Sequence, residues 1–429
     1  MTGCLSLLLY RALLPMLFLI AFPGWVLKML KRGGFGTALN ERIGIYFREA
    51  EFEPSGAIHF HSISVGETAL ALKLLKAWAA ESPGTRFVLA TGTATGHHFA
   101  TSAAIPGLRV TYSPLDFPWM IRSYLNRFEP ERIILIEGDV WPNLLRIAEK
   151  RGIRVDLANA RNSPRSARRL LKFAPALRPY FSKLSAVCIP EEQHRTLWQA
   201  LGIAPENIHQ TGNIKFDAES SPIPSPNPFF AEMLAAFGKN RPIVLAASTF
   251  PGEEEMLARA ILEADPAALP VIVPRHAERR AEVAQALSKA GFAVTLRSSF
   301  SPPSVETPHA FVIDSTGELA TWTAHADAVI IGKSFLSTGG QNPAEAILAR
   351  KPLILGPHMD NFQPLVRHLL EKGGALTAHD VTSITLAVCA ALDPQCAVEL
   401  TEKAMCVLSF HNGATRRHLS ALQDTRPSA

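Results

Sequence analysis

Acidic side chains follow apolar segments of this chain at positions where a carboxylate could accept a proton. Glu67 ends the stretch HSISVGE (61–67), which follows the apolar run AIHFH (57–61) and precedes a helix-like segment. At the carboxyl end of a strand, where open α/β sheets bind ligands, this carboxylate could serve as a general base. Ser64 and Glu67 also have the spacing of a capping box, in which both side chains bind free amides at a helix start. Spacing alone favours the cap and leaves the base as the alternative.

Two further acids and a lysine lie later in the first half of the chain. Glu137 and Asp139 end the expected strand in RIILIEGDVWPNLL (132–145). Acids this close can perturb each other's pKa, although a solvated loop is the alternative. Lys215, in TGNIKFD (211–217), would face a cleft between two domains, and a solvated side chain is the alternative.

The second half contains residues suited to a phosphate. VIVPRH ends an expected strand at Pro274, and Arg275 follows, where a guanidinium could bind a phosphate through two hydrogen bonds. An exposed arginine is the alternative. DSTGEL places Gly317 and Glu318 just past another strand, before a helix.

A glycine pair precedes a possible helix start in the stretch STGGQNPAEAIL. Asn342 can cap the helix, Pro343 suits its first turn, and Glu345 falls three residues after the cap. Gly339 and Gly340 would let the backbone approach a ligand, and free amides there favour an anion. Glu345 could accept hydrogen bonds from ribose hydroxyls, or complete a second cap. Neither GxGxxG nor GxxxxGK[ST] occurs, which disfavours a dinucleotide site and a P-loop.

Histidines, cysteines and net charge exclude other classes of site. His97 and His98 are adjacent but lack a second ligand cluster, and five cysteines show no metal spacing. His59 and His61 share one face of a strand, where packing is the usual role. A net charge of +5 without an RNA-binding motif or an aromatic-basic stripe gives no support for nucleic-acid binding. We therefore expect no metal and no nucleic acid.

Short apolar runs alternate with helix-like segments, and these elements must position the residues above. The expected strands are 57–61, 86–91, 132–137, 154–160, 185–190, 241–248, 269–276, 292–298, 309–314, 327–332 and 351–357. This alternation predicts an α/β protein with parallel sheets covered by helices on both faces. The proline-rich stretch AESSPIPSPNPFF (218–230) predicts a linker between a domain at 33–217 and a domain at 231–429.

The first 32 residues predict a membrane anchor. From Leu5 to Leu27 the only charged residue is Arg11, and a helix of this length would be about 34 Å long, enough to cross hydrocarbon. Three basic residues follow at Lys28, Lys31 and Arg32, which predicts that the remaining chain is cytoplasmic. Prolines within the segment leave a shallow interfacial anchor as the alternative.

Ten stretches in order resemble one family, the 3-deoxy-D-manno-octulosonic acid (Kdo) transferases, over almost the whole chain. They are HSISVGE, YSPLDFP, IEGDVWPN, NARNSPRSAR, TGNIKFD, AASTFPGEEE, PRHAER, DSTGEL, GGQNPAE and GPHMDNF. The resemblance implies a GT-B glycosyltransferase, with two Rossmann-like domains facing a cleft. It implies transfer of Kdo from CMP-Kdo to the lipid A precursor (lipid IVA), in lipopolysaccharide inner-core biosynthesis at the cytoplasmic face of the cell inner membrane. Transfer would be inverting and independent of metal.

The resemblance also implies roles for individual residues. Glu67 would be the catalytic base, and Glu137 and Lys215 would stabilise the transition state. The CMP contacts would be Pro274, Arg275, Thr316, Gly317, Glu318, Asn342, Pro343, Ala344 and Glu345. The chain departs from the family pattern at Gly138-Asp139, Thr316, Gln341 and Ala344. The alternatives are a GT-B lipid glycosyltransferase that uses a UDP-sugar and a catalytically silent, membrane-attached carbohydrate-binding protein.

Overall fold

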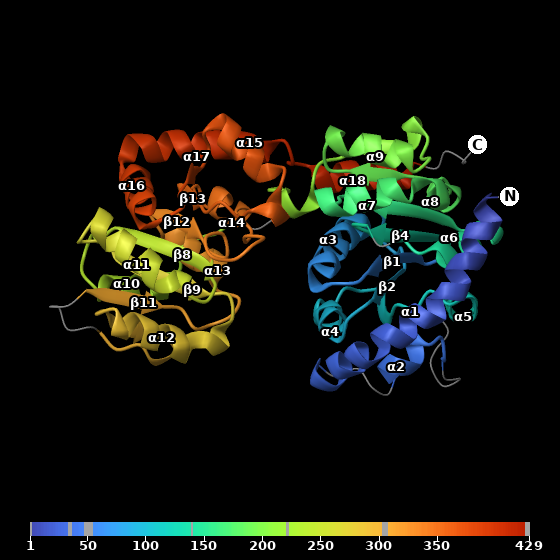
Figure 1. The fold of residues 1–429 in the computed structure, drawn as a ribbon, viewed down its shortest axis with the longest axis horizontal. Helices are drawn as coiled ribbons and strands as arrows, with labels where there is room; N and C mark the ends of the chain where they lie inside the picture. The colour runs from blue at the N-terminus through green and yellow to red at the C-terminus, as the bar shows by residue number, and fades with distance from the viewer. Residues whose placement is uncertain are drawn as a thin grey trace. The chain divides into compact units, whose positions relative to one another are not determined.

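The computed structural model describes residues 2–32, 37–46, 55–138, 140–219, 223–302 and 308–424 (Figure 1). Asp139, one of the two acids after the expected strand 132–137, lies outside these residues. The chain forms two compact units. Unit 1 comprises residues 1–220 and 413–429, and unit 2 comprises residues 221–412.

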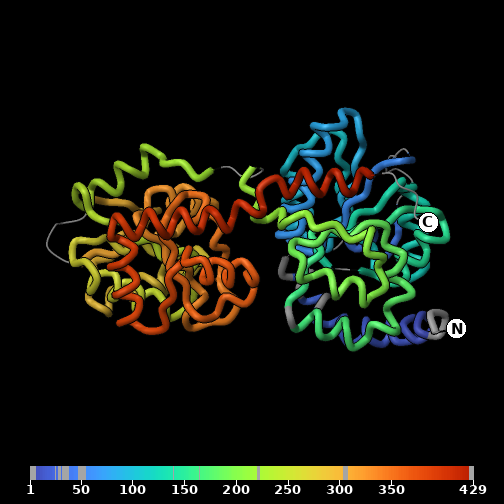
Figure 2. The backbone as a smooth tube through the Cα atoms, turned by 90° about the horizontal axis from the view of Figure 1, so that it is seen from above, coloured from blue at the N-terminus to red at the C-terminus, as the bar shows by residue number. Residues whose placement is uncertain are grey.

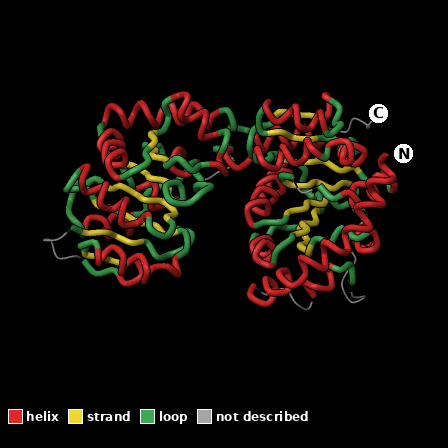
Figure 3. The backbone as a smooth tube through the Cα atoms, in the orientation of Figure 1, coloured by secondary structure: helices red, strands yellow, loops and turns green. Residues whose placement is uncertain are grey.

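Unit 1 is built on a parallel sheet of seven strands in the order β3-β2-β1-β4-β5-β6-β7. Figure 3 draws the strands in yellow among the helices in red. The strands are β1 (Ile58–Ser62), β2 (Phe87–Thr91), β3 (Leu108–Tyr112), β4 (Arg132–Ile136), β5 (Arg154–Ala158), β6 (Val187–Ile189) and β7 (Ile208–Gln210). Adjacent residues of β4 belong to different core clusters: Ile133 packs in one, and Ile134 in the other. Both faces of the sheet are therefore buried under helices, as the continuous apolar runs predict.

The helices of unit 1 are α1 (Thr2–Arg32), α2 (Thr37–Arg42), α3 (Val65–Glu81), α4 (Ala94–Ser102), α5 (Pro118–Phe128), α6 (Pro142–Lys150), α7 (Pro164–Lys172), α8 (Ala174–Phe181), α9 (Arg195–Ala200) and α18 (Ala414–Gln423). Helices α3 to α9 lie between the strands of unit 1 in the sequence, whereas α1 and α2 precede β1 and α18 follows unit 2. Residues Ser6–Gly24 of α1 are long and apolar enough to cross a membrane by length and composition. The expected apolar amino-terminal helix is thus present.

Unit 2 repeats the same architecture, with seven parallel strands in the order β10-β11-β9-β8-β12-β13-β14. The strands are β8 (Ile243–Thr249), β9 (Leu269–Pro274), β10 (Ala293–Leu296), β11 (His309–Val312), β12 (Ala328–Ile331), β13 (Leu353–Leu355) and β14 (Leu376–Thr377). The helices are α10 (Pro228–Ala235), α11 (Glu253–Ala264), α12 (Arg280–Lys289), α13 (Leu319–His325), α14 (Ala344–Leu348), α15 (Leu365–Lys372), α16 (Val381–Leu392) and α17 (Pro394–Ser409). Two parallel sheets, one in each unit, confirm the predicted α/β fold.

The end of the chain differs from the expected boundary, because α18 belongs to unit 1 and not to a domain at 231–429. In Figure 2 the chain can be followed from α17 to α18. The buried carboxylate of Asp217 accepts hydrogen bonds from the N–H groups of Gly413 (2.9 Å) and Thr415 (2.8 Å) at the start of α18. The expected linker is also shorter than 218–230, since α10 begins at Pro228. Residues 220–222 of that linker lie outside the described part of the chain.

Candidate functional site

The order of the strands in unit 1 reverses between β1 and β4. Ile58 of β1 pairs with Phe87 of β2 on one side and with Arg132 of β4 on the other. The carboxyl ends of β1 and β4 therefore lie next to each other. Open α/β sheets bind ligands outside the carboxyl ends of the strands at such a switch point.

Glu67 lies in the first turn of α3, immediately after β1. Its Oε2 accepts a hydrogen bond from the N–H of Ile63 (2.6 Å), and its Oε1 accepts one from the Ser64 hydroxyl (2.9 Å). The Glu67 N–H in turn donates to Ser64 Oγ (3.3 Å), which makes Ser64 the N-cap of α3. A regular capping box would use the N–H of Ser64, whereas this carboxylate binds the residue before it. Glu67 thus supports the Ser64 cap through the Ser64 hydroxyl and is held at the carboxyl edge of the sheet.

Glu137 follows β4 at the same edge. Its backbone adopts a positive φ of 66°, which is uncommon for a residue other than glycine and occurs often at functional sites. Its Oε1 accepts hydrogen bonds from Arg161 Nε (3.0 Å) and from Asn159 Nδ2 (3.4 Å). The side chain is therefore fixed by two neighbours that follow β5.

Asn159 connects Glu137 to the turn that carries Lys215. Its Oδ1 accepts a hydrogen bond from the N–H of Ile214 (3.2 Å), the residue before Lys215. Lys73 of α3 donates to the carbonyl of Ile214 (3.4 Å). The structure thus gathers the predicted residues Glu67, Glu137 and Lys215 on segments at one edge of unit 1. Sequence reasoning missed Asn159 and Arg161 as individual residues, although NARNSPRSAR, which begins at the end of the expected strand 154–160, was the available signal.

Three histidines of unit 1, His59, His61 and His97, pack against tyrosine rings. His59 and His61 are buried on β1, and His59 Nδ1 lies 2.8 Å from the Tyr124 hydroxyl. Burial lowers the pKa of His61 to about 4. His97 stacks on the ring of Tyr112 at 4.4 Å. Within the described residues, no group of three or more His, Cys, Asp or Glu side chains could hold a metal ion.

The predicted CMP residues of unit 2 lie in three segments: at the end of β9, after β11, and at the start of α14, which follows β12. Arg275 comes directly after β9, where its N–H donates to the carbonyl of Thr249 (3.0 Å) and its side chain is exposed. Thr316 and Gly317 are exposed after β11. An exposed guanidinium at the end of a strand can bind a phosphate with two parallel hydrogen bonds.

Glu318 is held by neighbours within unit 2. Arg297 donates to both of its oxygens, at 3.0 and 3.1 Å, and Trp322 Nε1 donates at 3.3 Å. The Ser315 hydroxyl donates to the same carboxylate. Burial acts to raise the pKa of Glu318, but the hydrogen bonds from Ser315, Arg297 and Trp322 and the charge of Arg297 outweigh burial and lower it. This carboxylate orders the loop before α13.

The stretch before α14 is shaped by packing as well as by helix capping. A Cβ atom on Gly339 would lie 2.5 Å from Asn361 Nδ2, and one on Gly340 would lie 2.3 Å from Met359 Sδ. Both glycines also have a positive φ (106° and 66°), which strains other residues, so backbone conformation favours glycine here in addition to any role beside a ligand. Asn342 Oδ1 accepts a hydrogen bond from the Ala344 N–H (3.2 Å). The helix begins at Ala344 with Pro343 at the N-cap, so Asn342 lies one residue before the cap and the predicted cap position is wrong by one residue. Glu345 lies in the first turn of α14.

A buried carboxylate that sequence reasoning did not single out organises the loop after β12. Glu253 accepts hydrogen bonds from the backbone N–H groups of Phe250 (2.9 Å), Lys333 (2.7 Å) and Phe335 (3.2 Å). It is the first residue of α11 and is fully buried. The run Glu253-Glu254-Glu255 was the visible signal, but burial of the first acid could not be inferred from three adjacent acids.

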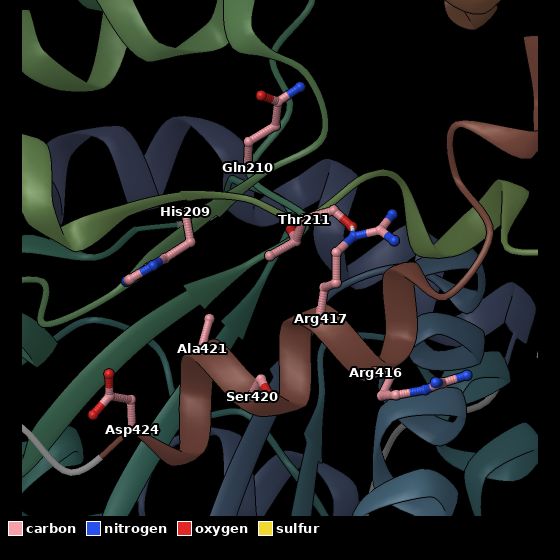
Figure 4. A pocket seen from close by; sticks show the side chains of 8 residues that line it. All are labelled: His209, Gln210, Thr211, Arg416, Arg417, Ser420, Ala421 and Asp424. Atoms are coloured by element: carbon pink, nitrogen blue, oxygen red, sulfur yellow. Dashed lines mark hydrogen bonds between the residues drawn. The ribbon is translucent and has the colours of Figure 1, made fainter.

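A pocket in unit 1 lies between β7 and α18 (Figure 4), and none of the predicted site residues is among those that line it. It is lined by His209, Gln210, Thr211, Arg416, Arg417, Ser420, Ala421 and Asp424. Its two guanidinium groups have partners: Arg417 Nε donates to the Thr211 carbonyl (3.0 Å), and Arg416 pairs with Glu219 (2.7 Å). Because both guanidinium groups already bind protein oxygens, the pocket is a weaker candidate for an anion site than its two arginines indicate.

The chain is similar in sequence to known proteins over most of its length. Residues 37–218 match the family model of 3-deoxy-D-manno-octulosonic-acid transferases. The chain is 33% identical over 430 residues to the 3-deoxy-D-manno-octulosonic acid transferase of Bordetella pertussis, which covers 96% of this chain and 97% of the relative. It is 32% identical over 406 residues to the corresponding transferase of Haemophilus influenzae, with 92% of each chain covered.

Solved structures show the same fold at low sequence identity. The UDP-GlcNAc 2-epimerase from Neisseria meningitidis, bound to UDP-GlcNAc, superposes with a TM-score of 0.60 and 12% identity, covering 86% of this chain and 100% of that chain. This likeness establishes the fold alone. The two Rossmann-like units have the GT-B architecture expected from the sequence, and the protein is a glycosyltransferase enzyme. Full-length similarity to its relatives places the chain in the 3-deoxy-D-manno-octulosonic acid transferase family.

Proposed function

We propose that the enzyme transfers Kdo from CMP-Kdo to the lipid A precursor, lipid IVA, in lipopolysaccharide inner-core biosynthesis. Unit 1 would bind the acceptor and unit 2 would bind CMP-Kdo. Family membership supports the reaction class. The observation that carries the assignment of the base is the position of Glu67, held by Ile63 and Ser64 at the switch point of unit 1.

The proposed reaction is a single displacement that inverts the anomeric carbon of Kdo. A lipid hydroxyl attacks this carbon as its bond to the CMP phosphate oxygen breaks, and the phosphate leaves with the bonding electron pair. The hydroxyl proton passes to the carboxylate of Glu67. General-base assistance of this kind is worth about 10²–10⁴ in rate.

Glu137 and Lys215 are proposed to stabilise the transition state. Glu137 is fixed by Arg161 and Asn159, so its charge is positioned before the reaction and needs no rearrangement. Lys215 would offset negative charge that develops on the leaving phosphate. Its turn is ordered by Asn213, whose Oδ1 accepts the Lys215 N–H (3.0 Å).

CMP is proposed to bind unit 2 through three segments at the carboxyl edge of the sheet. They are Pro274-Arg275, Thr316-Gly317-Glu318 and Asn342-Pro343-Ala344-Glu345. Arg275 is exposed and would pair with the phosphate. Glu318 is engaged by Arg297, so it would act by shaping its loop. We propose that no metal takes part in transfer.

The enzyme is proposed to work at the cytoplasmic face of the cell inner membrane, attached through its amino-terminal helix. The apolar composition of Ser6–Gly24 and the basic residues that follow it support this location.

The test is a donor profile with the purified full-length chain and lipid IVA in detergent. CMP-Kdo and a panel of UDP-sugars would be offered separately, and products would be identified by mass spectrometry. We expect addition of Kdo from CMP-Kdo only, with an inverted anomeric configuration by NMR. Turnover of a UDP-sugar without turnover of CMP-Kdo would sink the donor assignment. Binding of lipid IVA without turnover of any donor would instead indicate a carbohydrate-binding protein.

A further inference from the structure

The first half of α1 is joined to unit 1 by hydrogen bonds. Tyr10 donates its hydroxyl proton to Asp116 Oδ2 (2.9 Å), and Arg11 Nε donates to Asn143 Oδ1 (2.7 Å). Asp116 is buried and also accepts the N–H of Asn143 (3.0 Å) and of Leu144 (2.9 Å). Both partners of α1 therefore belong to the folded interior of unit 1.

Apolar and hydroxyl contacts extend this docked side along the helix. Leu7 is buried in the core of unit 1. Ser6 Oγ lies 2.8 Å from the Tyr180 hydroxyl, and the ring of Phe18 meets the edge of Phe117 at 5.7 Å. Residues 7, 10, 11, 14 and 18 are less exposed than their neighbours, which is the spacing of one helix face. Figure 1 shows α1 lying along the side of unit 1.

These contacts leave too little free helix to cross a bilayer. A span over Ser6–Gly24 would place Tyr10 and Arg11 in hydrocarbon together with the folded core that holds them. Beyond Phe18, 14 residues remain before α1 ends at Arg32. They would extend about 21 Å, whereas the hydrocarbon core is about 30 Å thick.

The opposite side of α1 presents apolar side chains to solvent. Within Ser6–Gly24 the most exposed large apolar side chains are Leu8, Leu9, Met16, Leu17, Leu19 and Ile20. A contiguous exposed apolar strip on one helix is typical of a membrane or protein contact. Lys28, Lys31 and Arg32 follow in the sequence and would be attracted to anionic headgroups.

We propose that α1 lies in the plane of the membrane interface, with this strip in the outer part of one leaflet and its docked side on unit 1. The inference rests on the proposed membrane attachment and replaces a spanning anchor with an interfacial one. Asp116 follows β3 and Asn143 follows β4, so α1 is fastened at the same sheet edge as Glu67 and Glu137. The leaflet would then lie beside the candidate site, where a lipid hydroxyl can reach Glu67 without leaving the membrane.

The side of the membrane on which the amino terminus lies distinguishes an interfacial helix from a spanning helix. The full chain, with an epitope tag at each end, would be bound to the outside of sealed vesicles of phosphatidylethanolamine and phosphatidylglycerol and treated with protease. An interfacial helix leaves both tags open to digestion. A spanning helix protects the amino-terminal tag while the carboxyl-terminal tag is lost, which would overturn the proposal.

A matched pair of leucines tests the exposed strip. Leu19 on α1 is 69% exposed and Leu386 on α16 is 66% exposed. We expect Leu19→Asp to weaken partitioning into these vesicles at least ~10-fold, a change that corresponds to about 1.4 kcal/mol, and Leu386→Asp to leave partitioning unchanged. Equal partitioning of Leu19→Asp and parent protein would exclude the strip as the membrane contact. A parent protein that binds no vesicles would refute membrane attachment itself, whereas the donor assignment would stand on the detergent assay.

Discussion

The side-chain amide of Asn159 lies between Glu137 and Ile214. Its Nδ2 is 3.4 Å from Glu137 Oε1, and its Oδ1 is 3.2 Å from the backbone nitrogen of Ile214. Asn159 is fully buried and has a positive φ of 54°, a conformation that asparagine tolerates better than most residues. One planar group thus holds both the Glu137 carboxylate and the turn that carries Lys215.

Asn159→Asp should lower kcat for Kdo transfer at least ~10-fold, because the change removes the donor to Glu137 and places a second carboxyl group beside it. The KM for CMP-Kdo should stay constant, since Asn159 belongs to unit 1. Steady-state kinetics would measure both. Asn240→Asp is the matched control, because Asn240 also has a positive φ (61°) but is exposed on unit 2. An equal loss of kcat in Asn159→Asp and Asn240→Asp would show that the loss comes from the positive-φ backbone conformation and not from the contact with Glu137.

Glu67→Gln should leave the melting temperature nearly unchanged and lower transfer at least ~100-fold. Glutamine can still accept the hydrogen bond from the Ile63 N–H, but it cannot take a proton from the acceptor hydroxyl. Thermal denaturation and a transfer assay would test both halves of the prediction. Glu81→Gln, at the other end of α3, is the control. Near-parental transfer by Glu67→Gln would reduce Glu67 to a helix cap.

Arg275→Ala should raise the KM for CMP-Kdo about tenfold or more, because an Arg–phosphate pair contributes binding that alanine cannot supply. Its exposed side chain predicts little change in stability. Arg280→Ala, an exposed arginine five residues further along, controls for loss of positive charge in general. An unchanged KM for Arg275→Ala would remove this residue from the CMP site.

The sequence was sufficient for features that depend on local patterns. Apolar runs separated by helix-like segments predicted the parallel sheets, and the ends of those runs located Glu67, Glu137 and Arg275 at sheet edges. Parallel strands align their carboxyl ends, so residues after β1 and β4 had to share one edge. The cap by Ser64 was also predictable, since it involves neighbours only three residues apart.

Contacts between segments that are distant in the sequence could not be predicted from the sequence patterns. Asp217 binds the start of α18 about 200 residues away, which moves α18 into unit 1. The contact of Asn159 with Ile214 depends on the order of β5, β6 and β7 in the sheet, which alternation does not specify. Likewise, the apolar composition of α1 predicted a membrane helix, whereas its docked side depends on Asp116, over 100 residues away.

Glu253→Gln should destabilise unit 2 by about 1–3 kcal/mol, since the new amide would direct a donor toward backbone N–H groups that need an acceptor. Because those groups belong to the loop leading to Asn342, the KM for CMP-Kdo should rise as well. Urea denaturation and kinetics would measure the two effects. Glu255→Gln is the control, because Glu255 is half-exposed and pairs only with Arg259 among the contacts found in the described residues. Equal stability of the two variants would contradict an ordering role for Glu253.

His418→Gln should change how the stability of unit 1 depends on pH. Nε2 of His418 accepts the N–H of Asn159 (3.1 Å), and Nδ1 lies 2.8 Å from the Ala414 carbonyl, so the ring is neutral with its proton on Nδ1. Burial lowers the pKa of His418 to about 4, and the charge of Arg417 acts in the same direction. As pH falls from about 6.5 to 4, the unfolded chain gains a proton that the folded chain does not. This difference lowers the free energy of unfolding of the parent protein by up to about 3 kcal/mol.

Glutamine can accept the same N–H but does not titrate, so the variant should lose less stability over this window. The free energy of unfolding, measured by urea denaturation at several pH values, should therefore fall more steeply for the parent than for His418→Gln between pH 6.5 and 4. Between pH 7 and 8.5, where the ring is neutral in both states, the difference between the two proteins should be constant. Other acids of unit 1 titrate in the same window, but they are common to both proteins and cancel in the comparison. Parallel curves across the whole range would show that folding leaves the pKa of His418 unchanged, contrary to its burial and its hydrogen bond with Asn159.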